Sequence, residues 1–139
     1  MTIKLKKRIL YISAFLYAIS FFLPAIYLYP DTLYGLYCAI WVVFGFIIDL
    51  DGASIQTLIF DVFLMLPNFL MILSFFFHKK FPRFLKYVFS LIVFTSAGYW
   101  VFSFGDALNS NLQVGYWMWL ISSTSFMLMT AMLSEKKVD

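Results

Sequence analysis

Residues 78–86, HKKFPRFLK, lie between two of the most apolar stretches of this chain of 139 residues. They contain four of the ten Lys and Arg residues. Short loops rich in Lys and Arg stay on the cytoplasmic side of a membrane during insertion, so this loop predicts how both flanking segments are oriented. We therefore expect an integral membrane protein whose threading is set by this loop.

The composition indicates that the chain lies in a membrane. Hydrophobic residues make up 63% of it and charged residues 12%, whereas about 25% of the residues in soluble domains are charged. A hydrocarbon core of about 30 Å needs roughly 20 helical residues per span, so residues 1–139 have room for about four or five spans in a single membrane domain. Strand-type alternation is missing from the long apolar runs, so helices are the predicted spanning form.

Charge determines how many segments are predicted to cross. If the ambiguous segment 33–48 crossed, the loop 78–86 would face outside and the acidic turn with Asp49 and Asp51 would face the cytoplasm, against the usual bias. If it does not cross, all ten Lys and Arg residues lie on one side. The predicted fold is an all-α membrane protein, a four-transmembrane-helix bundle with an extra re-entrant or interfacial helix between the first and second spans. The spans are predicted at about residues 9–29, 56–77, 84–104 and 114–133, and the outer, non-spanning helix at 33–48.

The N-terminal sequence MTIKLKKR directly precedes the first apolar run. Such a positive start is typical of a secretory signal, but the run is longer than the usual apolar region of about 7–15 residues, and no clear cleavage site follows it. We interpret the run as an uncleaved first span with its N-terminus inside. Four spans then return the C-terminus to the cytoplasm.

Two polar residues fall inside the predicted second span. Asp61 and Asn68 are two helical turns apart and therefore share one face. Both are costly if they face lipid, so we expect them to point into the bundle. For Asp61 the alternatives are a proton or ion path, a partner contact, a carboxylate that reaches the outer interface, or a protonated carboxyl that donates to a neighbouring helix. For Asn68 we expect helix–helix hydrogen bonding.

Proline and small residues indicate where helices meet. Pro67 frees the carbonyl oxygen of Phe63, which another helix or a water must satisfy. Gly115, Ser122 and Ser125 align on the last span at i, i+7 and i+10 and predict a face for close helix approach. A more polar stripe of the first span is expected to face neighbouring helices: Ser13, Tyr17, Ser20 and Pro24.

The part of the chain predicted to lie outside gathers aromatic and acidic side chains. Aromatic residues suit the headgroup region of a membrane. Asp51 or Ser54 is expected to cap the helix of the second span. The candidate outer surface consists of Tyr34, Tyr37, Trp41, Asp49, Asp51 and Asp106.

The residues that usually carry catalysis are scarce. The single histidine, His78, lies in the basic loop, and the single cysteine, Cys38, is predicted on the opposite side of the membrane, so no Cys/His pair can form. The acidic turn 49–52 resembles the start of a calcium loop, but Phe60 stands at the twelfth position, where such a loop needs a glutamate. We expect no cofactor, metal or nucleic-acid partner, since contact with anionic lipid headgroups explains the basic residues.

Three motifs together resemble a group of small uncharacterised bacterial four-helix inner-membrane proteins. They are SFFLPA at residues 20–25, the pair Pro67 and Asn68, and GYWMWLIS at residues 115–122. The group carries an F-L-P-A end of the first span, a glycine-containing outer segment, Asn-Pro in the next span and a G-Y-x-x-W-x-x-S start of the last. Here the order is Pro-Asn, and the tryptophan usually found just upstream is absent. The resemblance implies a bacterial inner-membrane location and this topology, but no activity.

Two main function hypotheses follow. The first is a non-enzymatic inner-membrane protein that binds a partner protein in the bilayer or at its outer face, for example an immunity protein that intercepts a toxin acting on the membrane. The second is a small oligomeric carrier or channel whose path is lined by Asp61 and Asn68. A lipid-modifying or quinone-linked enzyme is a third alternative, which the shortage of nucleophiles, bases and metal ligands opposes. The expected partners are therefore membrane lipid, another protein and, for a carrier, further copies of the chain.

Overall fold

The computed structural model of the chain describes residues 2–28, 30–77, 80–104 and 111–133. Within these residues the fold is helical, with five helices and one small antiparallel hairpin. In chain order the elements are α1 (Ile3–Ser20), β1 (Pro24–Leu28), β2 (Asp31–Tyr34), α2 (Gly35–Asp49), α3 (Ile55–Phe77), α4 (Arg83–Phe104) and α6 (Val114–Met132).

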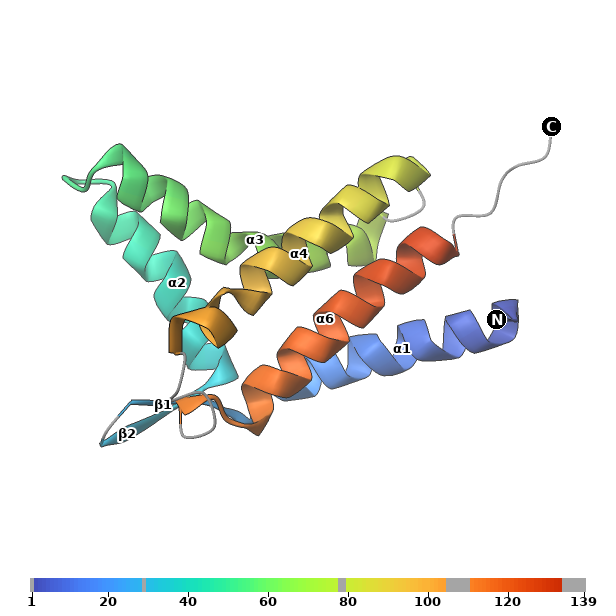
Figure 1. The fold of residues 1–139 in the computed structure, drawn as a ribbon, viewed down its shortest axis with the longest axis horizontal. Coiled ribbons are helices and arrows are strands. Elements are labelled where there is room, and N and C mark those ends of the chain that lie inside the picture. Colours follow the sequence, from blue (N-terminus) through green and yellow to red (C-terminus); the bar gives the residue numbers. More distant parts are fainter. Residues whose placement is uncertain (1, 29, 78–79, 105–110, 134–139) are drawn as a thin grey trace.

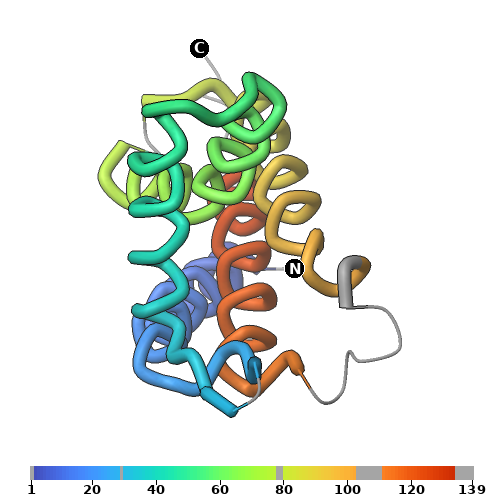
Figure 2. The backbone as a smooth tube through the Cα atoms, turned by 90° about the vertical axis from the view of Figure 1, so that its left-hand side faces the viewer, coloured from blue at the N-terminus to red at the C-terminus, as the bar shows by residue number. Residues whose placement is uncertain are grey.

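Four helices run back and forth along the long axis of the molecule, and the fifth runs across one end. Figure 1 shows α1, α3, α4 and α6 along the long axis, and Figure 2 shows α2 crossing the end that faces the viewer. The start of α1, the end of α3, the start of α4 and the end of α6 lie at the right-hand end of Figure 1. The hairpin and the turn between α2 and α3 lie at the left-hand end. The described basic residues of α1 and α4 are thus far from Asp49 and Asp51.

Helix α6 lies at the centre of the bundle, because it contacts each of the other described helices and β1. Its buried residues include several serines and threonines, which allow close packing. Ser122, Ser123 and Thr130 each donate a hydrogen bond to the carbonyl three residues earlier in the helix, at 3.2, 3.1 and 2.7 Å. Their hydroxyl groups are therefore satisfied inside the bundle without a partner on another helix.

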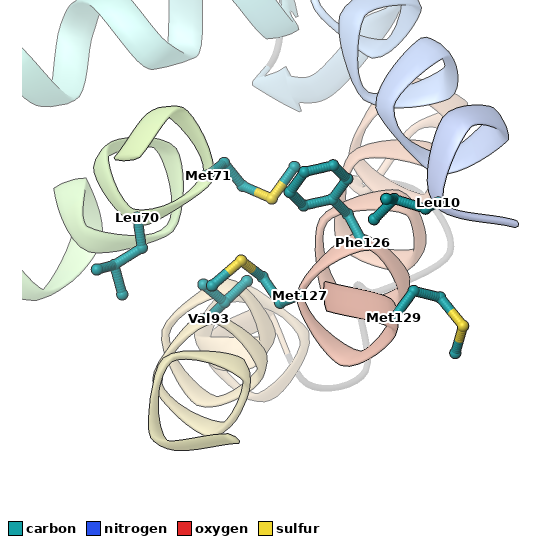
Figure 3. Close-up of a cluster of buried hydrophobic side chains, with 7 residues drawn as sticks. All are labelled: Leu10, Leu70, Met71, Val93, Phe126, Met127 and Met129. Atoms are coloured by element: carbon teal, nitrogen blue, oxygen red, sulfur yellow. The ribbon is translucent and has the colours of Figure 1, made fainter. Parts of the chain in front are cut away.

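The main core forms where α1, α3, α4 and α6 meet. Figure 3 shows Phe126 of α6 between Met71 of α3 and Leu10 of α1, with Met127 beside Val93 of α4. Val93 and Met127 are completely buried, at 0% exposure. This part of the bundle is therefore filled by side chains from all four long helices.

Two polar contacts hold helix ends and helix backbones together. Lys6 at the start of α1 donates from Nζ to the carbonyl oxygen of Met132 at 3.2 Å, and a cation at that place also stabilises the negative end of the α6 dipole. The Ser96 hydroxyl of α4 donates to the Phe63 carbonyl of α3, the group that Pro67 leaves without its helical partner. Of the two expected partners for this carbonyl, another helix or a water, the structure shows another helix.

The first predicted span needs a correction. The chain is helical from Ile3 only to Ser20, and residues 24–28, which were placed within the first span, form β1 paired with β2. Pro24 lacks the amide hydrogen that a helix needs, the residues that follow it favour strands, and Pro30 favours a turn. Segment 33–48 is helical only from Gly35, because its first two residues belong to β2.

The other predicted segments match the helices closely. Helices α3, α4 and α6 each begin and end within one residue of the predicted bounds. The Ser54 hydroxyl accepts a hydrogen bond from the Thr57 amide at 3.2 Å, so Ser54 caps α3 as expected. His78 and Asp106 lie outside the described residues.

Two of the described helices are long and apolar enough to cross a membrane, namely α3 and the stretch Arg83–Phe102 of α4. Helix α1 carries basic residues in its first turns, and α6 is rich in hydroxyl groups, which lowers its hydropathy. Helix α2 has 15 residues and is therefore about 22 Å long, less than the roughly 30 Å of a hydrocarbon core. The four-span threading stays a prediction.

Candidate functional site

The side chain of Asn68 joins three helices. Its Oδ1 accepts hydrogen bonds from the Tyr17 hydroxyl of α1 at 2.8 Å and from Trp119 Nε1 of α6 at 2.9 Å. An indole nitrogen can only donate, so the oxygen of the Asn68 amide must be the atom that faces Trp119. Both lone pairs of Oδ1 are thus occupied. The Nδ2 group has no hydrogen-bond partner among the described residues.

The sequence pointed to Asn68 but not to its partners. Tyr17 belongs to the polar stripe predicted on the first span, where Ser13 and Ser20 are buried as expected. Trp119 belongs to the motif at the start of the last span. Neither pattern says which helix faces which, so the pairing of Tyr17 and Trp119 with Asn68 emerges only from the packing.

Two glycines allow the hairpin to pack against the helices beside Asn68. A Cβ at Gly115 would lie 2.6 Å from the carbonyl oxygen of Pro24 and 2.7 Å from that of Leu23. A Cβ at Gly35 would lie 2.5 Å from the carbonyl oxygen of Ser20. Such separations are shorter than any real side chain tolerates, so both positions require glycine. The SFFLPA segment therefore packs directly against the GYWMWLIS segment.

Backbone hydrogen bonds fix the same junction. The amide of Gly35 donates to the carbonyl of Leu23 at 3.0 Å, and that of Leu36 to the carbonyl of Phe21 at 2.8 Å. On the other side, the amide of Gln113 donates to the carbonyl of Ala25 at 2.8 Å. These bonds satisfy polar backbone groups of the segment that follows α1.

Two cavities adjoin Asn68. The inner cavity, of about 60 Å³, includes Cys38, Tyr116 and Trp119 in its lining. The lateral cavity, of about 470 Å³, lies between α1, α2 and α3 and is lined by apolar side chains apart from Tyr17 and Asn68. Asn68 lines both cavities, so its amide group is the polar feature that they share.

A third space, the outer cavity, opens among the hairpin, α2, α3 and α4. It has a volume of about 680 Å³ and contains acidic and aromatic side chains in a mainly apolar lining. The acidic and aromatic members are Asp31, Asp61, Tyr37, Trp41 and Trp100.

Asp61 places a partly buried carboxyl group in the lining of the outer cavity. Its carboxyl lies beside that of Asp49 at the end of α2, and the two interact. Its Oδ2 atom is buried and has no hydrogen-bond partner among the described residues. Asp61 and Asn68 were predicted to share one face of the second span, but they line different cavities, so the structure does not join them in one site.

The remaining predicted site residues are dispersed. Tyr34 and Asp51 are exposed at the same end of the molecule as the outer cavity. Ser122 is buried and Ser125 half-buried on α6, and neither lines the three cavities.

The lining groups offer little nucleophilic chemistry. Burial raises the pKa of the Cys38 thiol to about 11, so the thiol stays protonated at neutral pH. Across residues 2–28, 30–77, 80–104 and 111–133, no group of three or more His, Cys, Asp or Glu side chains gathers to hold a metal ion. The arrangement is suited to binding through shape, hydrogen bonds and charge.

Comparison with known proteins finds no counterpart for this chain. No protein-family model matches it, and no significant similarity to a curated protein or to a solved structure is found. The resemblance of its three motifs to small bacterial inner-membrane proteins therefore stays a prediction.

Proposed function

We propose that the chain is a four-span protein of the bacterial inner membrane that binds a partner protein at its outer end, without catalysing a reaction. Helices α1, α3, α4 and α6 cross the bilayer, both termini lie in the cytoplasm, and α2 lies in the outer leaflet or along its surface. The hairpin and the outer cavity then face the outside.

The apolar surface supports a membrane location. Large hydrophobic side chains are exposed along the long helices, including Phe102 at 84%, Phe84 at 77% and Ile55 at 76%. Soluble monomers rarely expose contiguous apolar patches of more than a few hundred Å². Lipid is the natural cover for such a surface.

The position of α2 supports the proposed threading. It runs across the bundle (Figure 2) and has no buried residue. Tyr37 and Trp41 are about half exposed on this helix, and their rings make an edge-to-face contact at 6.1 Å. Aromatic side chains of this kind favour the headgroup region. A transverse helix also leaves the basic residues at one end of the bundle and the acidic turn at the other.

The outer cavity is the observation on which the partner proposal depends. Two acids, Asp31 and Asp61, stand in its lining with three aromatic rings, and no Lys or Arg lines it among the described residues. Carboxylates attract a cation, and aromatic faces add to that attraction. The outer cavity is therefore suited to a partner segment that carries both basic and apolar side chains. A toxin that acts on the inner membrane is one such partner, and the chain would then be its immunity protein.

Toxin challenge tests the proposed function. Bacteria that express the chain should survive at least one member of a panel of membrane-acting toxins that kills cells without it, and Asp61→Asn should reduce survival. Asp51→Asn is the matched control, because Asp51 is an exposed acid of the same end that does not line the outer cavity. Equal killing across the panel, including any toxin encoded by a neighbouring gene, would count against this function.

The threading has a separate test. In a chain whose only cysteine has been changed to serine, Asp51→Cys should react with a membrane-impermeant reagent added outside intact cells, and Lys80→Cys should react only after the cells are opened. Labelling of position 80 from outside would reverse the topology and remove the outer cavity from the exterior.

A carrier or channel is the second candidate, and the buried Oδ2 of Asp61, which has no hydrogen-bond partner within the described part of the chain, favours it. However, Asp61 and Asn68 line different cavities, and the bundle beyond Asn68 is filled by the core side chains of Figure 3. A path would have to form between copies of the chain. Flux through proteoliposomes that is unchanged by Asp61→Asn and by Asn68→Leu would remove this candidate.

A further inference from the structure

The side chain of Lys86 brings a positive charge into the bundle. Lys86 is 5% exposed and stands in line with Ser90, Val93 and Ala97, at i, i+4, i+7 and i+11, which are all buried. It therefore belongs to the face of α4 that packs on the other helices. Within residues 2–28, 30–77, 80–104 and 111–133, its ammonium group has neither a hydrogen bond nor an ion pair. A charge this deeply buried is costly unless it is paired.

The ammonium group of Lys86 lies near the start of α4. Lys86 is the fourth residue of that helix, and helical side chains lean towards the N-terminus of their helix. Its Nζ is not one of the buried side-chain atoms that lack a partner, so this atom reaches the surface. The start of α4 lies beside the ends of α3 and α6 (Figure 1). The charge is therefore accessible at this end of the bundle.

The first turn of α4 offers three further hydrogen-bond donors. The amides of Arg83, Phe84 and Leu85 have no hydrogen-bond partner in the part of the chain that the structure describes. The next amide, that of Lys86, donates to the carbonyl of Pro82 at 3.3 Å. No acidic residue stands in this turn, and basic residues at the positive end of a helix dipole are unfavourable without an anion. Free amides at such a helix start are typical donors to phosphate.

The acidic residues that the structure describes lie away from this end. Asp31 belongs to the hairpin, Asp49 and Asp51 lie at or beyond the end of α2, and Asp61 is the seventh residue of the 23-residue helix α3. None of them pairs with Lys86. The buried charge and the free amides are therefore suited to an anion that is not part of the described chain.

The exposed face of α4 indicates what carries that anion. Phe84, Tyr87, Leu91 and Phe94 are all exposed, and they follow one another at i, i+3, i+7 and i+10. They form one apolar stripe that begins at the first turn of the helix. A phosphate group attached to a long apolar chain matches the donors and the stripe together. In the proposed threading α4 begins at the cytoplasmic boundary of the membrane, where the phosphates of the inner leaflet lie.

We propose that the start of α4 is a binding site for the phosphate group of a phospholipid. The phosphate oxygens accept hydrogen bonds from the free amides of the first turn and pair with the Lys86 ammonium, while an acyl chain lies along the apolar stripe. Such a site is more specific than a general attraction between basic residues and anionic headgroups. The assignment to the inner leaflet depends on the threading proposed above, whereas the binding itself does not depend on a partner protein.

Native mass spectrometry of the purified chain in detergent tests this proposal. The chain is incubated with an equimolar mixture of phosphatidylglycerol and a monoglucosyl diacylglycerol with the same acyl chains, which carries no phosphate. We expect phosphatidylglycerol to be retained at least about 10-fold more, as one hydrogen bond to a charged group predicts. Equal retention of the two lipids would overturn the proposal.

Two matched variants locate the binding. Lys86→Met removes the charge and keeps an unbranched apolar side chain, so it should lower the retention of phosphatidylglycerol about 10-fold and leave the glucolipid unchanged. Lys80→Met removes the same charge from an exposed position of the same end, where the ammonium lies over the Phe77 ring. It should change the retention by no more than about 2-fold. If Lys86→Met does not fold by circular dichroism, Lys86→Gln, which also removes the charge, takes its place.

The outcomes separate this site from its alternatives. Equal losses in Lys86→Met and Lys80→Met would reveal a general attraction to basic residues and overturn the site. Undiminished retention in Lys86→Met would mean that the lipid binds elsewhere. Displacement of phosphatidylglycerol by an equal concentration of inorganic phosphate would assign the site to free phosphate and overturn the lipid assignment. A negative toxin challenge would leave these results unaffected, because that challenge reports on the outer cavity at the opposite end.

Discussion

Helix α2 is more apolar than helix α6, yet α2 lies at the edge of the bundle and α6 at its centre. Helix α6 has nine buried residues, and α2 has none. A Cβ at Gly115 of α6 would collide with the hairpin backbone, whereas a Cβ at Gly45 of α2 would meet nothing within 4 Å. The contrast shows that apolarity alone does not place a helix at the centre of a bundle. Small and hydroxylated residues, which let backbones approach, decide it.

The largest effect is expected from Gly115→Ala. Its Cβ would lie too close to the carbonyls of Pro24 and Leu23 for the backbone to stay in place, so we expect a loss of about 3 kcal/mol in the free energy of unfolding. Gly45→Ala is the matched control and should be neutral or slightly stabilising, because alanine favours a helix over glycine by about 1 kcal/mol. Unfolding in mixed micelles, followed by circular dichroism, measures both. Equal effects would mean that α6 does not pack against the hairpin as described.

Asn68→Leu should have the next largest effect. It leaves the Tyr17 hydroxyl and the Trp119 N–H of the bundle without their acceptor, at an expected cost of about 1–3 kcal/mol. Tyr17→Phe in the same background should then cost little, since its hydrogen bond is already gone. A double-mutant cycle on the unfolding free energy tests this coupling. Strictly additive effects would contradict it.

Ser96→Ala should have a smaller effect. It removes the donor to the Phe63 carbonyl, which Pro67 has already deprived of its helical partner, and we expect a loss of about 1 kcal/mol. Thr95→Ala is the control, because Thr95 is exposed and donates only within its own helix. That change should stay within about 0.5 kcal/mol. A larger effect for Thr95→Ala than for Ser96→Ala would refute the role of Ser96.

The smallest expected change concerns reactivity and involves no loss of stability. Burial raises the pKa of Cys38 to about 11, so its thiolate, the form that reacts, should increase with pH until about that value. We expect maleimide labelling to rise about tenfold per pH unit between pH 7 and 9. Asp51→Cys in a Cys38→Ser chain should react faster and level off near pH 9, because an exposed thiol has a pKa of about 8.5. Similar rates at pH 7 would show that α2 is less well packed than described.

The long helices and the hairpin differ in how well the sequence predicted them. The apolar runs that became α3, α4 and α6 are long and are flanked by polar or charged residues such as Ser54, so their bounds followed from the pattern. The hairpin was missed, because residues 24–28 are as apolar as a span, and Pro24 alone does not say that a strand follows. The apolar pattern of these residues would also suit a helix, but they form a strand. Pairing with β2 satisfies their backbone hydrogen bonds in place of a helix.

The candidate sites were predictable in part. Asn68 and Asp61 stood out because polar groups are costly inside a membrane. They line different cavities, and Leu64, which lies between them on α3, lines both the inner and the outer cavity. Contacts between helices that are far apart in the chain determine which residues line each cavity. The helical periodicity of a single segment does not predict those contacts.

The contact between α1 and α6 has a consequence for biosynthesis. Helix α1 packs most closely against a helix that is made much later, and Gln113 and Leu112 complete the hairpin that follows α1. The earlier helices must therefore stay incompletely packed until translation of α6 is finished. Chains that stop before Val114 should be degraded faster by cellular proteases, even though they contain every other helix that the structure describes.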